Sequence, residues 1–98
     1  MIKVSVMYEG SAQDKFDVDY YQNSHLPMVK ETVGAAIKNV ELNVGVGDSP
    51  IKAIGNITFE SMDAFKNEFL PHMAKFQADV PNYTNIEPVL QISDVRVV

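Results

Sequence analysis

The alternation of apolar and polar positions predicts two of the strands in this chain. Residues 2–8 alternate with Ile2, Val4, Val6 and Tyr8 on one face, and residues 40–46 repeat the pattern. This period of two is typical of a strand with one buried face. A third strand is predicted over residues 52–60 and a last one over residues 89–98. The glycine-rich stretch at 45–50 predicts the turn that joins the second strand to the third.

Two other segments have the spacing of amphipathic helices. The first is predicted from about residue 17 to 35, with Asp17 as a candidate N-cap and Asp19 favoured by the helix dipole. The second follows Ser61, another candidate N-cap, and a loop is expected at 81–82. Its apolar residues recur every three or four positions, at Met62, Phe65, Phe69, Met73 and Phe76.

Each predicted helix contains a proline. Pro27 lacks the N–H that would bond the carbonyl of Asn23, so we expect a kink or break at residues 23–27. Pro71 is expected to bend the second helix without ending it.

The resulting order is strand, helix, strand, strand, helix, strand. Two right-handed crossover units of this kind predict an α+β, ferredoxin-like βαββαβ fold, with a four-stranded antiparallel sheet and two helices on one face. Ninety-eight residues leave no room for a second hydrophobic core, so residues 1–98 are expected to form a single domain.

The sheet face away from the helices is mixed in character. The alternation assigns it both polar and apolar side chains: Ser5, Met7, Asn43, Ile54, Asn56, Thr58 and Gln91. Such a face is too apolar to remain bare in water, so we expect a homodimer. The face is then either a plain dimer interface, or one wall of a barrel that encloses an amphipathic pocket for a small molecule.

Composition excludes several classes of function. The net charge is −5 and no basic run is present, which argues against nucleic-acid binding. The chain has no cysteine, and its histidines have no acidic residue at the spacing of a metal site, so neither a metal nor another cofactor is expected. The N-terminus does not resemble a signal peptide and no apolar run could span a membrane, which favours the cytoplasm.

His25 is the candidate general acid or base. It follows Tyr21 by one helical turn and stands just before Pro27. Histidine titrates near neutral pH, and carbonyls freed by the proline could fix one ring nitrogen while the other faces a cavity. The alternative is a packed histidine that only anchors the kink. His72 lies off the apolar stripe of its helix and is expected to be exposed or held by a structural hydrogen bond.

Two segments resemble the EthD family, which is named for a protein of ethyl tert-butyl ether degradation. One is Phe16-x-Asp-x-Asp-Tyr-Tyr-x-x-x-His-x-Pro, and the other runs from Asp79-Val80-Pro81-Asn82-Tyr83 to Ile92. The resemblance covers nearly the whole chain and implies a dimeric α+β barrel. It also implies that His25 borders the barrel cavity.

Six further residues are candidates for binding a substrate. Three tyrosines combine an apolar ring with a polar hydroxyl, although such residues commonly pack at interfaces. Three amides could donate or accept hydrogen bonds, and the one at position 85 could instead cap a loop. These candidates are Tyr8, Tyr21, Tyr83, Asn43, Asn85 and Gln91.

The leading hypothesis is a cofactor-independent enzyme that moves a proton on a small apolar or aromatic carbonyl compound. Monooxygenase, cyclase, dehydratase and isomerase chemistry all fit this description, because each can begin beside a carbonyl. The alternatives are a non-catalytic binding or accessory protein of a degradation pathway, and a purely structural dimer.

Overall fold

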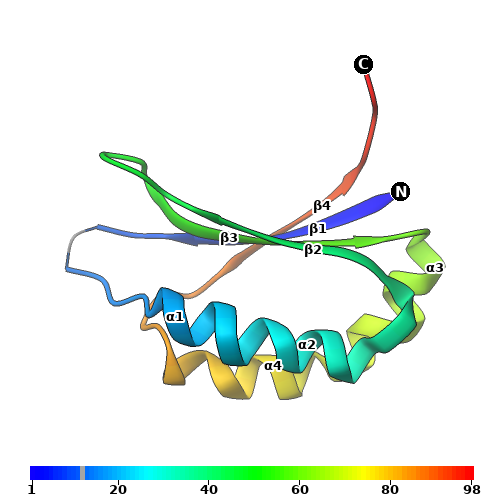
Figure 1. Ribbon diagram of the computed structural model, residues 1–98, viewed down its shortest axis with the longest axis horizontal. Coiled ribbons are helices and arrows are strands. Elements are labelled where there is room, and N and C mark those ends of the chain that lie inside the picture. Colours follow the sequence, from blue (N-terminus) through cyan, green and yellow to red (C-terminus); the bar gives the residue numbers. More distant parts are fainter. Residues whose placement is uncertain (12) are drawn as a thin grey trace.

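The computed structural model describes residues 1–11 and 13–98, and it contains one four-stranded antiparallel sheet. The strands are β1 (Ile2–Glu9), β2 (Ile37–Val44), β3 (Ile51–Phe59) and β4 (Val89–Asp94), in the order β2-β3-β1-β4. Both helical segments cover the same face of the sheet (Figure 1). The predicted α+β, ferredoxin-like fold is therefore confirmed, with both crossovers on one side.

The predicted strands differ from the observed ones mainly at their ends. Strand β2 begins earlier than predicted and ends at Val44, which leaves Val46 in the turn. The last strand stops at Asp94, and the C-terminal residues extend away from the sheet (Figure 1). Alternation in the tail, Val95-Arg96-Val97-Val98, resembles a strand, but no neighbouring strand pairs with it among the described residues.

The strand register confirms the predicted division of the sheet into two faces. Val4 pairs with Ile57 and Ile92 on the helix-covered face, whereas Ser5 pairs with Asn56 and Gln91 on the open face. The covered face packs against the helices through two clusters of buried residues. One contains Val4, Val29, Val33, Ile57, Phe59, Phe65, Phe69 and Phe76, and the other contains Tyr8, Tyr21, Leu26, Ala53, Tyr83 and Ile86.

The first helical segment stays continuous through its proline, so of the expected kink or break at residues 23–27 the break is absent. It consists of α1 (Val18–Tyr20), a π-helical turn (Tyr21–His25) and α2 (Leu26–Val33), and it ends in a 3₁₀ turn (Gly34–Ala36). The N–H of Leu26 bonds to the carbonyl of Tyr21, five residues back. This wider turn lets the chain absorb Pro27, whose ring nitrogen has no hydrogen to donate.

The second helical segment repeats this construction. It begins at α3 (Met62–Ala64), widens into a π-helical turn (Phe65–Phe69), passes through a 3₁₀ turn at Pro71 (Leu70–His72) and continues as α4 (Met73–Asp79) and a further 3₁₀ turn (Val80–Asn82). The segment continues past Pro71, as expected, and the 3₁₀ turn Leu70–His72 contains this proline. The side chains of Asp17 and Ser61 cap the two segments by accepting the N–H groups of Tyr20 and Ala64.

The two π-helical turns give equivalent positions to His25 and Phe69. Each is the last residue of its turn, and each is followed by Leu-Pro. Both side chains are buried and line the same internal cavity. The first helix therefore places a titratable group where the second places a plain aromatic ring.

Replacing Pro27 with alanine tests whether the π-helical turn depends on the proline. Alanine restores the N–H at position 27, so we expect the helix to tighten and the His25 ring to rotate. Stability should fall by up to about 1 kcal/mol, because proline also restricts the unfolded chain. A crystal structure of the variant with an unmoved His25 would show that the turn has another cause.

Candidate functional site

The imidazole of His25 lies between the helices and the sheet and is only 5% exposed. It stacks on Tyr21, with ring centroids 5.3 Å apart and planes inclined by 13°. Tyr83 packs against it from the C-terminal segment, at a centroid distance of 4.8 Å. Tyr21 from the same helix and Tyr83 from a distant part of the chain therefore fix the orientation of the ring.

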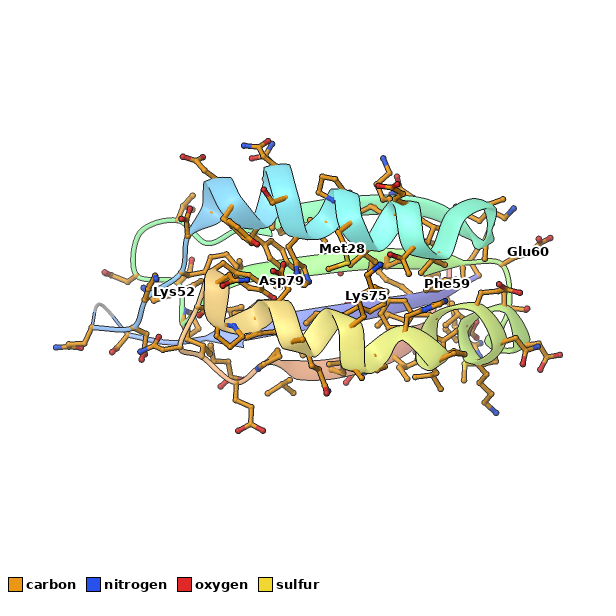
Figure 2. The ribbon with its side chains drawn as sticks, turned by 90° about the horizontal axis from the view of Figure 1, so that it is seen from below. Met28, Lys52, Phe59, Glu60, Lys75 and Asp79 are labelled. Atoms are coloured by element: carbon orange, nitrogen blue, oxygen red, sulfur yellow. The ribbon has the colours of Figure 1, made fainter. Side chains whose placement is uncertain are left out.

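Asp79, the last residue of α4, binds one nitrogen of this ring. Its Oδ2 lies 2.8 Å from Nδ1 of His25. Its other oxygen, Oδ1, accepts hydrogen bonds of 2.8 Å from the hydroxyl of Tyr20 and the amide of Asn82. Figure 2 shows Asp79 between the two helical segments, with the sheet behind them. Three donors thus hold the carboxylate that orients His25.

Burial and hydrogen bonding set the protonation states of this pair. Burial lowers the pKa of His25, although the hydrogen bond and the charge of Asp79 oppose that effect. Burial raises the pKa of Asp79, but the hydrogen bonds from Asn82, His25 and Tyr20 outweigh it and the net shift is downward. At neutral pH the pair is a neutral imidazole and a carboxylate, so Nδ1 carries the proton and donates a hydrogen bond to Asp79.

The second ring nitrogen, Nε2, remains available. The only side-chain hydrogen bond of His25 within residues 1–11 and 13–98 is the one to Asp79. No fully buried polar side-chain atom in that part of the chain lacks a partner, so Nε2 is not sealed in the interior. With Nδ1 protonated, Nε2 carries a lone pair and can accept a proton from a ligand.

Three buried tyrosines, two of which pack against the ring of His25, remain protonated. The hydroxyls of Tyr8 and Tyr83 lie 2.7 Å apart, and the rings of Tyr8 and Tyr21 meet edge to face. Burial raises the pKa of all three phenols. In the Tyr8–Tyr83 pair one hydroxyl donates and the other accepts, so the accepting hydroxyl keeps a proton that it can itself donate.

A cavity of about 60 Å³ borders His25 on the helix-covered side of the sheet. Its polar lining comes from His25, Gln77 and the three tyrosines, and no charged side chain is among the described residues that line it. The remaining wall is apolar and includes Val29, Ile57, Phe69, Met73 and Phe76. An apolar cavity with a few oriented polar groups is the usual form of a small-molecule site.

The structure brings four of the seven predicted site residues together. His25, Tyr8, Tyr21 and Tyr83 share this cavity. Asn43 and Gln91 lie on the open face of the sheet, so within one chain they are separated from His25 by the sheet itself. This cavity lies between the helices and the sheet of one chain, and the pocket predicted between two facing sheets stays a prediction.

The remaining candidates have local roles. Asn85 accepts a hydrogen bond of 2.8 Å from the backbone N–H of Lys15, which is the loop-capping alternative. It also lines a surface groove next to the cavity. His72 is partly buried and its ring centroid lies 6.2 Å from that of Phe76.

Sequence reasoning missed Asp79 and Gly55. Asp79 stood in the quoted C-terminal segment, Asp79-Val80-Pro81-Asn82-Tyr83, but nothing in its spacing from His25 indicated a contact. Gly55 lies on β3 directly beneath Tyr21, where a Cβ atom would overlap the tyrosine hydroxyl. The described residues contain no group of three or more potential metal ligands, and none of their helices is long and apolar enough to cross a membrane.

Comparison with known proteins identifies relatives of the whole chain. The family model of the EthD domain matches residues 9–87. An EthD-like protein from Ralstonia eutropha JMP134 is 36% identical, with a TM-score of 0.90 over 98% of this chain and 92% of that one. A search of curated proteins finds no match.

Two more distant structures share the fold alone. A protein from Bordetella bronchiseptica, described as a candidate antibiotic biosynthesis monooxygenase, is 11% identical, with a TM-score of 0.68 over 98% of this chain and 97% of that one. A dimeric protein of unknown function and ferredoxin-like fold from Bacteroides fragilis NCTC 9343 is 12% identical, with a TM-score of 0.56 over 96% of this chain and 95% of that one.

Proposed function

This chain belongs to the EthD family, and from that premise we propose that it is an enzyme that transfers a proton on a small apolar or aromatic carbonyl compound. His25 is the general base, and Asp79 is the residue that positions it. The observation that carries the proposal is the Asp79 hydrogen bond, which fixes the proton on Nδ1 and leaves the lone pair on Nε2 of a histidine that lines an apolar cavity.

The chemistry follows from the protonation states. Nε2 removes a proton from the carbon next to the substrate carbonyl. The electrons of that C–H bond form a C=C bond, and the π electrons of the carbonyl move to its oxygen, which gives an enolate. A tyrosine hydroxyl stabilises the new oxyanion by donating a hydrogen bond. Asp79 stabilises the imidazolium that forms, which then returns its proton to carbon or to a leaving group.

Several overall reactions can follow this first step. Isomerisation, cyclisation and dehydration need no other reagent, whereas oxygenation would also require molecular oxygen. Oxygenation is supported only by the description of the Bordetella protein of similar fold as a candidate monooxygenase. No step of the proton transfer itself calls for a cofactor.

A non-catalytic binding or accessory protein is the second candidate. The largely apolar lining of the cavity favours this candidate, because apolar walls alone would hold a neutral aromatic ligand. Its volume of about 60 Å³ is smaller than the roughly 300 Å³ of typical ligand sites. Side chains along its rim must therefore move in either case before a substrate-sized molecule can enter.

Deuterium exchange tests the enzymatic proposal without knowledge of the natural substrate. A panel of enolisable aromatic ketones and 1,3-dicarbonyl compounds is incubated with the protein in D₂O, and loss of the C–H signal next to the carbonyl is followed by NMR. We expect the protein to exchange this hydrogen faster than buffer alone does, and we expect the effect to depend on His25. Binding of these compounds without any protein-dependent exchange would leave the binding protein as the better description.

We also propose that the chain forms a two-fold homodimer through the open face of its sheet. Ser5 donates a hydrogen bond of 2.7 Å to Asn56, and the Asn56 amide bonds Asn43 on the neighbouring strand. This ordered polar network adjoins an apolar row formed by Ile54, Met7 and Val89. A face of this composition is suited to another protein surface, and the Bacteroides protein of similar fold is described as dimeric.

Light scattering at micromolar protein concentration tests the dimer. We expect twice the chain mass, with each protomer burying on the order of 1,000 Å². Met7→Glu places a charge in the apolar row of the open face and should yield monomers, whereas Ala74→Glu on an exposed helix position is the matched control. A monomer mass for the unmodified chain would disprove the proposal.

A further inference from the structure

The cavity beside His25 and a larger surface groove have four residues in common. The groove has a volume of about 710 Å³ and runs along the end of α4 and the start of β4. Gln77, Val80, Pro88 and Leu90 line both the groove and the cavity. The small internal space therefore adjoins a groove roomy enough for a ligand, and these four side chains form the boundary between the two.

We infer that substrate reaches His25 between α4 and β4, and that Leu90 is the residue that limits its size. Leu90 pairs with Val6 in the strand register, so it lies on the helix-covered face of the sheet, the face that the cavity occupies. Its side chain is 39% exposed although it contacts the cavity. A large apolar side chain at such a boundary blocks the way by its bulk alone.

The position of Leu90 in the sheet supports this role. Strand β4 is one of the two edge strands of the described sheet and pairs with β1 alone among the described strands. An edge strand is held by one ladder of hydrogen bonds, so its side chains and backbone yield more readily than those of β1 or β3. The proposed dimer uses the opposite face of the sheet, so the entrance stays open in the dimer.

The lining of this route also indicates the charge of the substrate. Neither the cavity nor the groove has a lysine or arginine among the described residues that line it, and the only charged one is the carboxylate of Glu87 in the groove. A carboxylate or phosphate would meet no counter-charge along this path. The route therefore favours a neutral molecule, with its carbonyl at His25 and any outer polar group beside Gln77.

The inference rests on the proposed function for the identity of the ligand, but binding alone can test it. The chain has two histidines, so the His25 ring signal can be assigned by NMR through its loss in His25→Gln, with His72 as an internal reference. Acetophenone and the larger 2-acetonaphthone are titrated against that signal. Leu90→Trp should weaken the acetophenone response at least tenfold, and Leu90→Ala should allow 2-acetonaphthone to shift the signal.

Ile92→Trp is the matched control, because Ile92 lies two residues along the same face of β4, is 43% exposed and does not line the cavity. It should leave both titrations unchanged. Equal responses in Leu90→Trp and the unmodified chain, or an equal loss in Ile92→Trp, would overturn the inference. So would a His25 signal that no ketone moves even in Leu90→Ala. Leu90-dependent binding without deuterium exchange would instead support the entrance and refute the enzymatic proposal.

Discussion

Replacing His25 with glutamine is expected to lower the rate of deuterium exchange by about 10²- to 10⁴-fold, the usual contribution of a positioned general base. Glutamine is polar and of similar size, and its side-chain amide can still donate to Asp79. Ketone affinity should therefore stay nearly unchanged. Initial exchange rates and binding constants, measured on the same protein sample, separate the two effects.

Asp79→Asn distinguishes a positioning role from a merely structural one. An asparagine oxygen can still accept from Nδ1, but the negative charge that stabilises the imidazolium is removed. Since Asp79 raises the pKa of His25 in the native protein, the variant should have a lower one. The acid limb of the exchange–pH profile should move to lower pH, together with a lower plateau rate.

The sign of the pH dependence follows from the lowered pKa of His25. The base must be neutral to act, so the exchange rate should rise with pH, with its midpoint below the ordinary value of 6.5. Stability should follow a related course, because His25 and Asp79 both bind protons more readily in the unfolded chain. Their contribution is complete above about 6.5 and is lost as pH falls through the two folded-state values.

A different outcome would assign His25 an anchoring role. If His25→Gln left exchange unchanged but cost about 1–3 kcal/mol of stability, the imidazole would serve mainly to hold Asp79 and the π-helical turn. Urea unfolding of the variant measures that cost. The proposed function requires that His25→Gln lose turnover without losing stability.

The fold was accessible from the sequence because each face of each element has a repeating pattern. Ser5, Asn56 and Gln91 were assigned to one face by alternation, and the register places them in one row. Strand ends were less predictable, since alternation continues into the tail beyond Asp94 although no neighbouring strand pairs with it among the described residues. The alternation of apolar and polar residues indicates which face of the sheet a side chain lies on, but the presence of a pairing strand decides where a strand ends.

The site was only partly accessible, for reasons of geometry. His25 stood out through its place before Pro27, but the same proline predicted a break, whereas the helix widens into a π-helical turn and continues. The contact of His25 with Asp79 joins two helices far apart in sequence, and its 2.8 Å distance depends on how the helices cross. Periodicity within one helix contains no information on that crossing. Asp79 could therefore be found only in three dimensions.

A substitution at Gly55 is expected to have the second large effect, because Gly55 lies beneath Tyr21, the residue that stacks on His25. A Cβ atom on Gly55 would overlap the hydroxyl of Tyr21 and lie 3.2 Å from its Cζ atom. Tyr21 is 2% exposed and stacks on His25, so any shift of its ring disturbs that stack. The absence of a side chain at position 55 thus allows the tyrosine ring to reach the sheet and hold the imidazole in place.

Gly55→Ala should therefore destabilise the protein by about 1–3 kcal/mol, the usual cost of overpacking a core. The direction is informative, because alanine in a strand interior is ordinarily more stable than glycine by about 0.5–1 kcal/mol. The His25 ring signal should shift and deuterium exchange should fall, since Tyr21 must tilt away from the imidazole. Chemical unfolding and the NMR spectrum of the same variant provide both measurements.

Tyr21→Phe supplies the control that ties this cost to one contact. Phenylalanine keeps the ring that stacks on His25 but lacks the hydroxyl that the new Cβ would strike, and the nearest ring carbon at 3.2 Å is tight but tolerable with a small shift. Adding Tyr21→Phe to Gly55→Ala should recover most of the lost stability, with a coupling free energy of about 0.5–3 kcal/mol in the double-mutant cycle. It should also restore the His25 signal. Additive effects of the two substitutions, or a Gly55→Ala variant as stable as the unmodified chain, would show that the strand or the ring adjusts freely and that Gly55 does not position His25.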